Sequence, residues 1–186
     1  MEPLDDDSVT RVNRFYRHME ESFIKVVDDV ISEEFVRFAL QAKGNLNIED
    51  SNINSIGYIV ANRKDPDKKY GVVIRYRNIP GSETRSQTFD DLESIKQNCA
   101  KNQLIPTIGF VLYDKEEKYG YVFIFTVEQL EHLASSGKIG DEISYVKCGI
   151  QIKYGINHKT VKEMLDKLKS NLDYIEITMG EKDFTE

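Results

Sequence analysis

Basic side chains are concentrated in one part of the chain. Residues 63–85 contain seven basic and three acidic side chains, a net charge of +4, whereas the whole chain carries −7 and the remainder therefore −11. Such a pattern predicts an anion site confined to this region. Lysines at a strand turn can also serve only to discourage edge pairing, and that alternative stays open. The seven basic residues are Arg63, Lys64, Lys68, Lys69, Arg75, Arg77 and Arg85.

Arg75 and Arg77 stand two positions apart in the apolar segment VVIRYR. Side chains two apart in a strand point to the same face, so both arginines would share a face with Val73. A guanidinium on a covered face needs an anionic partner. It could pair with a carboxylate of the fold, such as Glu93 or Glu20, or face a groove and hold a phosphodiester in its forked donors.

Other residue types give weaker indications of chemistry. Asp65 and Asp67, with Glu20, could supply carboxylates to a divalent metal, although Asp-Pro-Asp between two strands is typical of a turn. The three histidines are far apart and predict surface or capping roles rather than a metal site. They are His18, His132 and His158. No phosphate loop, GxGxxG or GxSxG motif is present, so the sequence gives no indication of an NTPase, a Rossmann dehydrogenase or an α/β-hydrolase.

Two further residue types are expected to be structural. Cys99 and Cys148 are far apart and outside any CxxC motif, which predicts two reduced, buried thiols instead of a disulfide or a zinc site. Tyrosines in the expected strands could stack on nucleobases, but strand aromatics more often pack in a core. These tyrosines are Tyr58, Tyr70, Tyr76, Tyr119, Tyr121 and Tyr154.

Composition sets the class of protein that must position these groups. The chain has 186 residues, of which 40% are hydrophobic and 31% charged, enough for a core without disulfide or metal support. The net charge of −7 argues against indiscriminate binding of nucleic acid or anionic membranes by the whole surface. The first residues lack a secretory signal, and no apolar run approaches the roughly 18 residues of a membrane span, so we expect a cytoplasmic protein without membrane contact.

The N-terminal part is expected to be helical. Residues 1–7 form an acidic lead, and Ser8 can cap a helix that carries apolar residues at helical spacing as far as Val30. A second helix is expected from Ser32 to Gly44. Its buried stripe would be Phe35, Val36, Ala39 and Leu40. This long helical region could serve as an arm for a homodimer.

The rest of the chain predicts alternating strands and helices. A polar stretch, 45–54, precedes a hairpin of strands 56–64 and 70–78. A loop, 80–87, and a helix from a Thr88–Asp91 capping box to Asn102 lead to strands 107–114 and 118–125. A helix begins at the Thr126–Gln129 capping box and ends at Gly137. The remaining elements are a half-buried strand 143–154, a helix 159–171, an edge strand 173–179 and a tail, 180–186, expected to be flexible.

These elements predict one α/β domain over residues 8–179, with a central mixed sheet flanked by helices. The order helix, hairpin, charged strand, helix, apolar strand over residues 8–125 resembles the PD-(D/E)XK, or restriction-endonuclease-like, nuclease fold. In active members of that family, one Asp lies on the first strand or its turn. The next strand ends in a hydrophobic run followed by a carboxylate, any residue and Lys.

The resemblance places VVIRYR at the family's second motif, so that Arg75 would match the carboxylate and Arg77 the Lys. Asn62 or Asp65 lies nearest to the first Asp. Magnesium prefers hard oxygen ligands, and an arginine at a ligand position opposes it. The resemblance therefore implies a degenerate active site without conventional metal-assisted hydrolysis.

Three functions follow as hypotheses. The leading one is a non-catalytic module without a cofactor, which engages DNA, RNA or an acidic protein through the basic hairpin and the pair Arg75 and Arg77. The first alternative is a Mg²⁺- or Mn²⁺-dependent nuclease with relocated carboxylates at Asp65, Asp67 and Glu20. The second is a structural or regulatory subunit that acts through protein–protein contacts, in which the arginines only satisfy carboxylates of the fold.

Overall fold

The computed structural model describes residues 33–37, 39–41, 45–78, 86–114, 119–154, 160–161, 163–164, 166–167 and 180–183. The expected helix over residues 8–30 and the expected strand over residues 173–179 lie outside these ranges, as does the proposed dimerisation arm except for the helical residues from position 33 onward. Gly44 and the expected loop residues 80–85 lie outside them as well.

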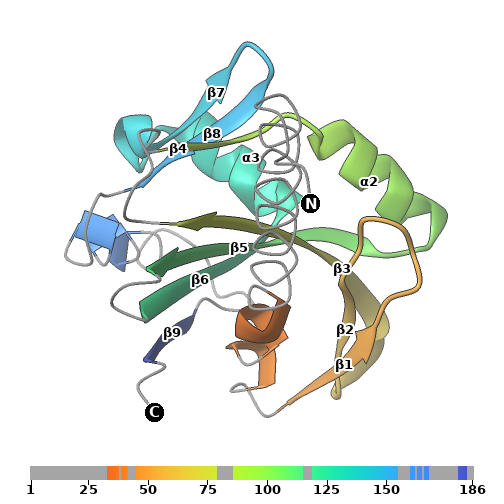
Figure 1. The fold of residues 1–186 in the computed structure, drawn as a ribbon. Coiled ribbons are helices and arrows are strands. Elements are labelled where there is room, and N and C mark those ends of the chain that lie inside the picture. The colour runs from red at the N-terminus through yellow and green to blue at the C-terminus, as the bar shows by residue number, and fades with distance from the viewer. Residues whose placement is uncertain are drawn as a thin grey trace, which may run out of the picture.

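The protein is an α/β fold built on a mixed six-stranded sheet (Figure 1). Strands β3 and β5 are parallel, and the other neighbouring strands pair antiparallel. The strands follow the order β1 (Leu46–Asp50), β2 (Tyr58–Asn62), β3 (Asp65–Asn78), β5 (Ile105–Asp114), β6 (Tyr119–Thr126) and β9 (Gly180–Asp183). The expected hairpin of two strands is thus confirmed as β2–β3, and the two expected apolar strands as β5 and β6. The position expected for the hairpin turn was wrong, since the chain turns at residues 63–64 and Asp65 and Asp67 belong to β3.

One face of this sheet is covered by two helices and a second, smaller sheet (Figure 1). The helices are α2 (Leu92–Lys101) and α3 (Val127–Ser136), and a short 3₁₀ helix, η1, spans Gly140–Glu142. The small sheet has the order β4 (Ser86–Phe89), β8 (Gly149–Lys153) and β7 (Ile143–Val146). Phe110, Phe123 and Phe125 of the central sheet are buried beneath this layer.

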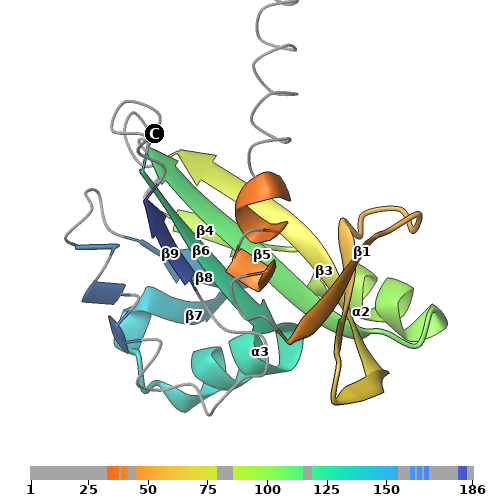
Figure 2. The same ribbon diagram turned by 90° about the horizontal axis from the view of Figure 1, so that it is seen from below.

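The opposite face is covered by the helical residues 33–37 and 39–41, which lie across β3 and β5 (Figure 2). The expected stripe of Phe35, Val36, Ala39 and Leu40 is buried here, as predicted. A Cβ added at Gly109 of β5 would lie 3.0 Å from Val36 Cγ2, so the absent side chain allows this close approach. Because β5 and β6 are covered on both faces, nearly all of their described side chains are apolar.

Local signals at α3 are confirmed. Gln129 N donates to Thr126 Oγ1 over 3.2 Å, and Thr126 N donates to Gln129 Oε1 over 2.8 Å, which completes the predicted capping box. Gly137 ends the helix with φ of 64°. Of the expected helix 159–171, the described residues are helical, and Val161 and Met164 are buried.

Several sequence-based expectations were wrong. Thr88 does not cap a helix: residues 86–89 form β4, and α2 begins only after Asp91, whose side chain makes no capping hydrogen bond. The expected single strand 143–154 is the hairpin β7–β8, turned at residues 147–148. The expected polar stretch 45–54 contains the edge strand β1, and the expected flexible tail contains the edge strand β9.

The two cysteines also differ from each other, since Cys99 is buried as predicted and Cys148 is exposed. Cys148 lies in the turn between β7 and β8, where the predicted continuous strand would have turned it inward. In the part of the chain that the structure describes, no helix combines the length and the apolar character that a membrane span requires.

Candidate functional site

The hairpin tip, defined as Arg63, Lys64, Lys68 and Lys69, carries four exposed basic side chains. Residues 65–69 of β3 extend beyond the pairing with β5, which starts at Tyr70, so the tip projects past the neighbouring strand. Asn62 Oδ1 accepts a hydrogen bond from Lys64 N over 2.9 Å, and Arg63 Nε donates to Asn47 Oδ1 over 3.1 Å. The Lys68 ammonium lies 5.7 Å from the centroid of the Tyr70 ring.

Asp65 and Asp67 lie exposed at the same tip. Four basic and two acidic side chains give residues 63–69 a net charge of +2, so the carboxylates reduce the positive potential without removing it. Among the described residues, no group of three or more His, Cys, Asp or Glu side chains is arranged to hold a metal ion. Glu20, the third carboxylate of the nuclease hypothesis, lies outside the described residues.

Arg75 and Arg77 lie on the α2 face of β3, as strand alternation predicts, because Val73 belongs to the core beneath α2 and Val72 to the core beneath the helical residues 33–37 and 39–41. Arg75 pairs with the Asp91 carboxylate, and its Nη1 donates to Ile74 O over 3.0 Å. The side chains of the pair are 30% and 40% exposed. Arg77 is exposed.

The expected partner Glu93 does not reach Arg75. Its carboxylate lies 2.5 Å from Lys96 Nζ, which also contacts Glu131 of α3 at 2.9 Å. The hydrogen bonds that Lys96 donates to Glu93 and Glu131 raise its pKa, and the one to Glu131 joins α2 to α3. Glu93 was therefore the wrong choice among the nearby acidic residues, and the other expected partner, Glu20, is outside the described ranges.

The basic residues singled out by the sequence thus form two groups. Arg75 is six positions after Lys69 along β3, a distance of about 20 Å at the rise of an extended strand. The hairpin tip lies at one end of the strand, and Arg75 and Arg77 lie near the other. Arg85 is outside the described residues.

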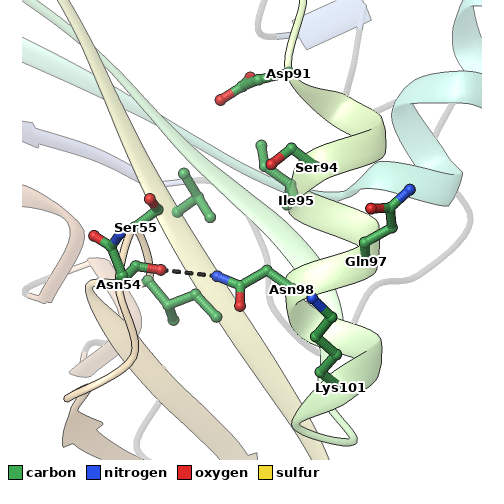
Figure 3. A pocket seen from close by; sticks show the side chains of 10 residues that line it. Asn54, Ser55, Asp91, Ser94, Ile95, Gln97, Asn98 and Lys101 are labelled. Atoms are coloured by element: carbon green, nitrogen blue, oxygen red, sulfur yellow. Dashed lines mark hydrogen bonds between the residues drawn. The ribbon is translucent and has the colours of Figure 1, made fainter.

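A pocket of about 290 Å³ lies between α2 and the loop 51–57 that precedes β2 (Figure 3). Its apolar floor is formed by Ile56, Val73 and Ile95. Figure 3 shows Asn54 and Ser55 on the loop side, opposite residues of α2. The polar residues that line the pocket are Asn54, Ser55, Asp91, Ser94, Gln97, Asn98 and Lys101.

Hydrogen bonds hold the loop wall of this pocket in place. Ser51 N donates to Gly57 O over 3.0 Å, which closes the loop at its base. Asn98 Nδ2 donates to Asn54 O over 2.8 Å and joins the loop to α2. Ser55 has a φ of 68°, a left-handed conformation that few side chains other than Asn and Asp adopt readily.

The sequence did not reveal the pocket. Asn54 and Ser55 fell in a stretch whose only visible property was polarity, and Ser94 and Asn98 lay on the expected solvent side of a helix. The spacing of 94 and 98 does place these two side chains one turn apart on the same helix face, beside the buried Ile95 and Cys99. No feature of the sequence of α2 indicated that the loop 51–57 would lie opposite that face.

The remaining candidate groups have structural or surface positions. His132 is exposed on α3, and His18 and His158 are outside the described residues. Burial raises the pKa of the Cys99 thiol, which lowers its thiolate fraction and hence its reactivity. The core assignment is confirmed for four of the tyrosines: Tyr58, Tyr70, Tyr121 and Tyr154 are buried.

Comparison of the sequence with models of known protein families and with curated proteins finds no significant match.

Proposed function

We propose that this chain is a non-catalytic binding module with a degenerate nuclease-like fold, and that it engages nucleic acid through the hairpin tip. The observation that carries the proposal is the exposure of all four basic side chains of the tip on a ribbon that projects past β5. Lysine and arginine side chains bind phosphates with release of counterions. Because β1 pairs with β2 as far as Asn62, the tip stands at the end of three neighbouring strands.

The order of elements supports the nuclease-like part of the proposal. Apart from β4, which pairs in the small sheet, the β2–β3 hairpin is followed by α2 and by β5, which is parallel to β3, in the order on which the resemblance rests. Arg75, at the position that would match a metal-binding carboxylate, is engaged by Asp91. A cation at that position opposes a metal, and this favours binding over hydrolysis.

The proposal is tested by fluorescence anisotropy with labelled single- and double-stranded DNA and RNA between about 50 and 200 mM salt, over which phosphate binding weakens steeply. We expect the double variant Lys68→Ala/Lys69→Ala to weaken binding to all sequences alike. The slope of log K against log salt for duplex DNA should fall by about 2, because each phosphate contact contributes about 0.9.

The matched control is Lys138→Ala/Lys153→Ala, which removes the same charge from exposed positions outside the hairpin and should leave the slope unchanged. Unaltered affinity in the hairpin variant would overturn the assignment of the site. Absence of binding at 50 mM salt would redirect the search to an acidic protein partner. Mg²⁺-dependent cleavage that Asp65→Ala or Asp67→Ala abolishes would establish the nuclease alternative instead.

A further inference from the structure

The pocket beside α2 lies on the same face of β3 as part of the hairpin tip. A Cβ added at Gly71 would lie 3.1 Å from both Cys99 Sγ and Leu104 Cδ1, so the C-terminal end of α2 covers Gly71. Lys69 is two residues earlier in the strand and shares this face. The helix therefore runs from Asp91, beside Arg75, back toward the hairpin tip, with Lys101 at its near end (Figure 3).

Cations consequently lie at both ends of the pocket. Lys69 and Lys101 lie toward the hairpin, and the exposed Arg77 lies beyond the pair of Arg75 and Asp91. A nucleic-acid strand that follows this face would place its phosphates near these side chains on either side of the pocket.

The chemistry of the pocket matches that of a single nucleobase. Ile56, Val73 and Ile95, each at most 5% exposed, give the pocket a small apolar floor that part of a flat base can touch, and polar side chains make up the rest of the lining. The hydroxyls of Ser55 and Ser94 can donate or accept hydrogen bonds at the polar edge of the base. The Asp91 carboxylate is an acceptor for an exocyclic amino group, such as that of cytosine.

The size of the pocket and the hydrogen bond between its walls restrict the kind of ligand that it can bind. A volume of about 290 Å³ is at the lower end of the roughly 300–1,000 Å³ typical of small-molecule pockets, so it has room for one small ring system. Bases inside a duplex are stacked and paired, and only an unpaired base can enter such a site. The Asn98–Asn54 hydrogen bond fixes the two walls before any ligand arrives.

We infer that this pocket holds one unpaired base of a nucleic-acid strand, while the hairpin tip binds the backbone of the same strand. The inference rests on the proposed function and specifies the kind of nucleic acid. The protein should bind a strand that has at least one unpaired base in preference to a continuous duplex.

The test compares two labelled strands of equal length by anisotropy, one an ordinary single-stranded DNA and the other an abasic strand with the same number of phosphates. We expect the native protein to bind the ordinary strand about tenfold more tightly, because the pocket contacts a base in that strand and finds none in the abasic strand. A blunt duplex of the same length should lack this advantage.

A variant that fills the pocket tests whether the preference for the ordinary strand arises there. Ser94 is exposed on α2 and lines the pocket, so Ser94→Leu, which fills the pocket without adding an aromatic ring, should abolish the preference for the ordinary strand and leave the salt slope unchanged. Ser135→Leu, at an exposed position of α3, is the matched control and should retain the preference. Lys68→Ala/Lys69→Ala should weaken binding of both strands to the same extent.

The possible failures are distinguishable. Equal affinity of the native protein for the ordinary and abasic strands would overturn the base pocket and leave the proposed function standing. A preference that survives in Ser94→Leu would equally overturn it. Binding of the duplex but of neither single strand would overturn the base pocket alone, whereas absence of binding to both strands and to the duplex at 50 mM salt would overturn both proposals. The comparison of strands uses the native protein and does not depend on the folding of any variant.

Discussion

Arg75 lies on the α2 face of β3 and reaches across to Asp91, the residue before α2 begins. Strand alternation was sufficient to predict that this guanidinium would need an anionic partner on that face. The identity of the partner depends on where the helix starts. With the start at Leu92, Asp91 precedes the helix and faces Arg75, whereas Glu93 lies on the outer side beside Lys96. The start expected at Thr88 obscured that difference.

The exposure of this ion pair sets its energetic contribution. Because the two side chains are 30% and 40% exposed, Arg75→Ala should lower the free energy of unfolding by only about 1 kcal/mol. Urea unfolding followed by circular dichroism would measure this change. Arg77→Ala is the control, and as an exposed side chain it should change stability by less than about 0.5 kcal/mol.

A larger loss of unfolding free energy in Arg75→Ala would favour a structural role for the arginine. If Arg75→Ala cost more than about 3 kcal/mol, the Asp91 carboxylate would be behaving as a buried charge without a partner. That outcome would favour the structural or regulatory alternative, in which the arginines exist to satisfy carboxylates of the fold.

At the scale of elements, α2 begins late because residues 86–89 pair with β8 in the register Phe89–Ile150. Phe89 then packs edge-on against Phe110 and Phe125, with ring centroids 5.8 and 6.5 Å apart. Thr88 and Asp91 have the spacing of a capping box, but the strand partner lies about 60 residues away. Local propensity therefore predicted the helix and its buried face, and a non-local pairing decided its first residue.

A non-local strand pairing also explains why the sequence did not predict the β7–β8 hairpin. The alternation of residues 143–154 runs through the turn at 147–148, so it could not show that the chain reverses there. Gly149 was the available signal. A Cβ added at this position would lie 2.0 Å from Phe89 O, so the backbone of β4 occupies the space of a side chain. The strands β1 and β9 were missed because edge strands with many polar residues carry little hydrophobic pattern.

Gly149→Ala tests this close approach. The added methyl group must separate β4 from β8, and we expect a loss of about 3 kcal/mol in the free energy of unfolding. Gly137→Ala is the matched control, since it also lies at positive φ, 64°, but has no atom within 4 Å of the added Cβ. It should cost about 1 kcal/mol, the price of the left-handed conformation alone. Equal losses in urea unfolding would contradict the tight β4–β8 contact.

At the scale of the whole molecule, the central sheet separates two apolar clusters. One lies beneath α2, α3 and the small sheet and includes Cys99, and the other lies beneath the helical residues 33–37 and 39–41 and includes Leu40. Neighbouring residues of β3 and β5 contribute alternately to the two clusters. Because both clusters share these strands, they are expected to unfold together rather than as separate units.

Whether the two clusters unfold together can be measured by a substitution in one cluster and a readout in the other. Leu40 is fully buried, so Leu40→Ala should cost about 2–5 kcal/mol. In a Cys148→Ser background, Cys99 is the only thiol, and it is reached by a labelling reagent through unfolding. If unfolding is cooperative, Leu40→Ala should raise the rate of Cys99 labelling by about 30- to 4,000-fold, at tenfold per 1.4 kcal/mol.

The control is Gln41→Ala, an exposed neighbour on the same helical segment, which should leave the labelling rate within about twofold. A Leu40→Ala protein that loses helix signal by circular dichroism but labels Cys99 at the original rate would contradict cooperative unfolding. The helical residues 33–37 and 39–41 would then unfold while α2 and its neighbours on the other face of the sheet remain folded. That layer forms the pocket, so the same result would mean that the pocket keeps its shape when the opposite face of the sheet is uncovered.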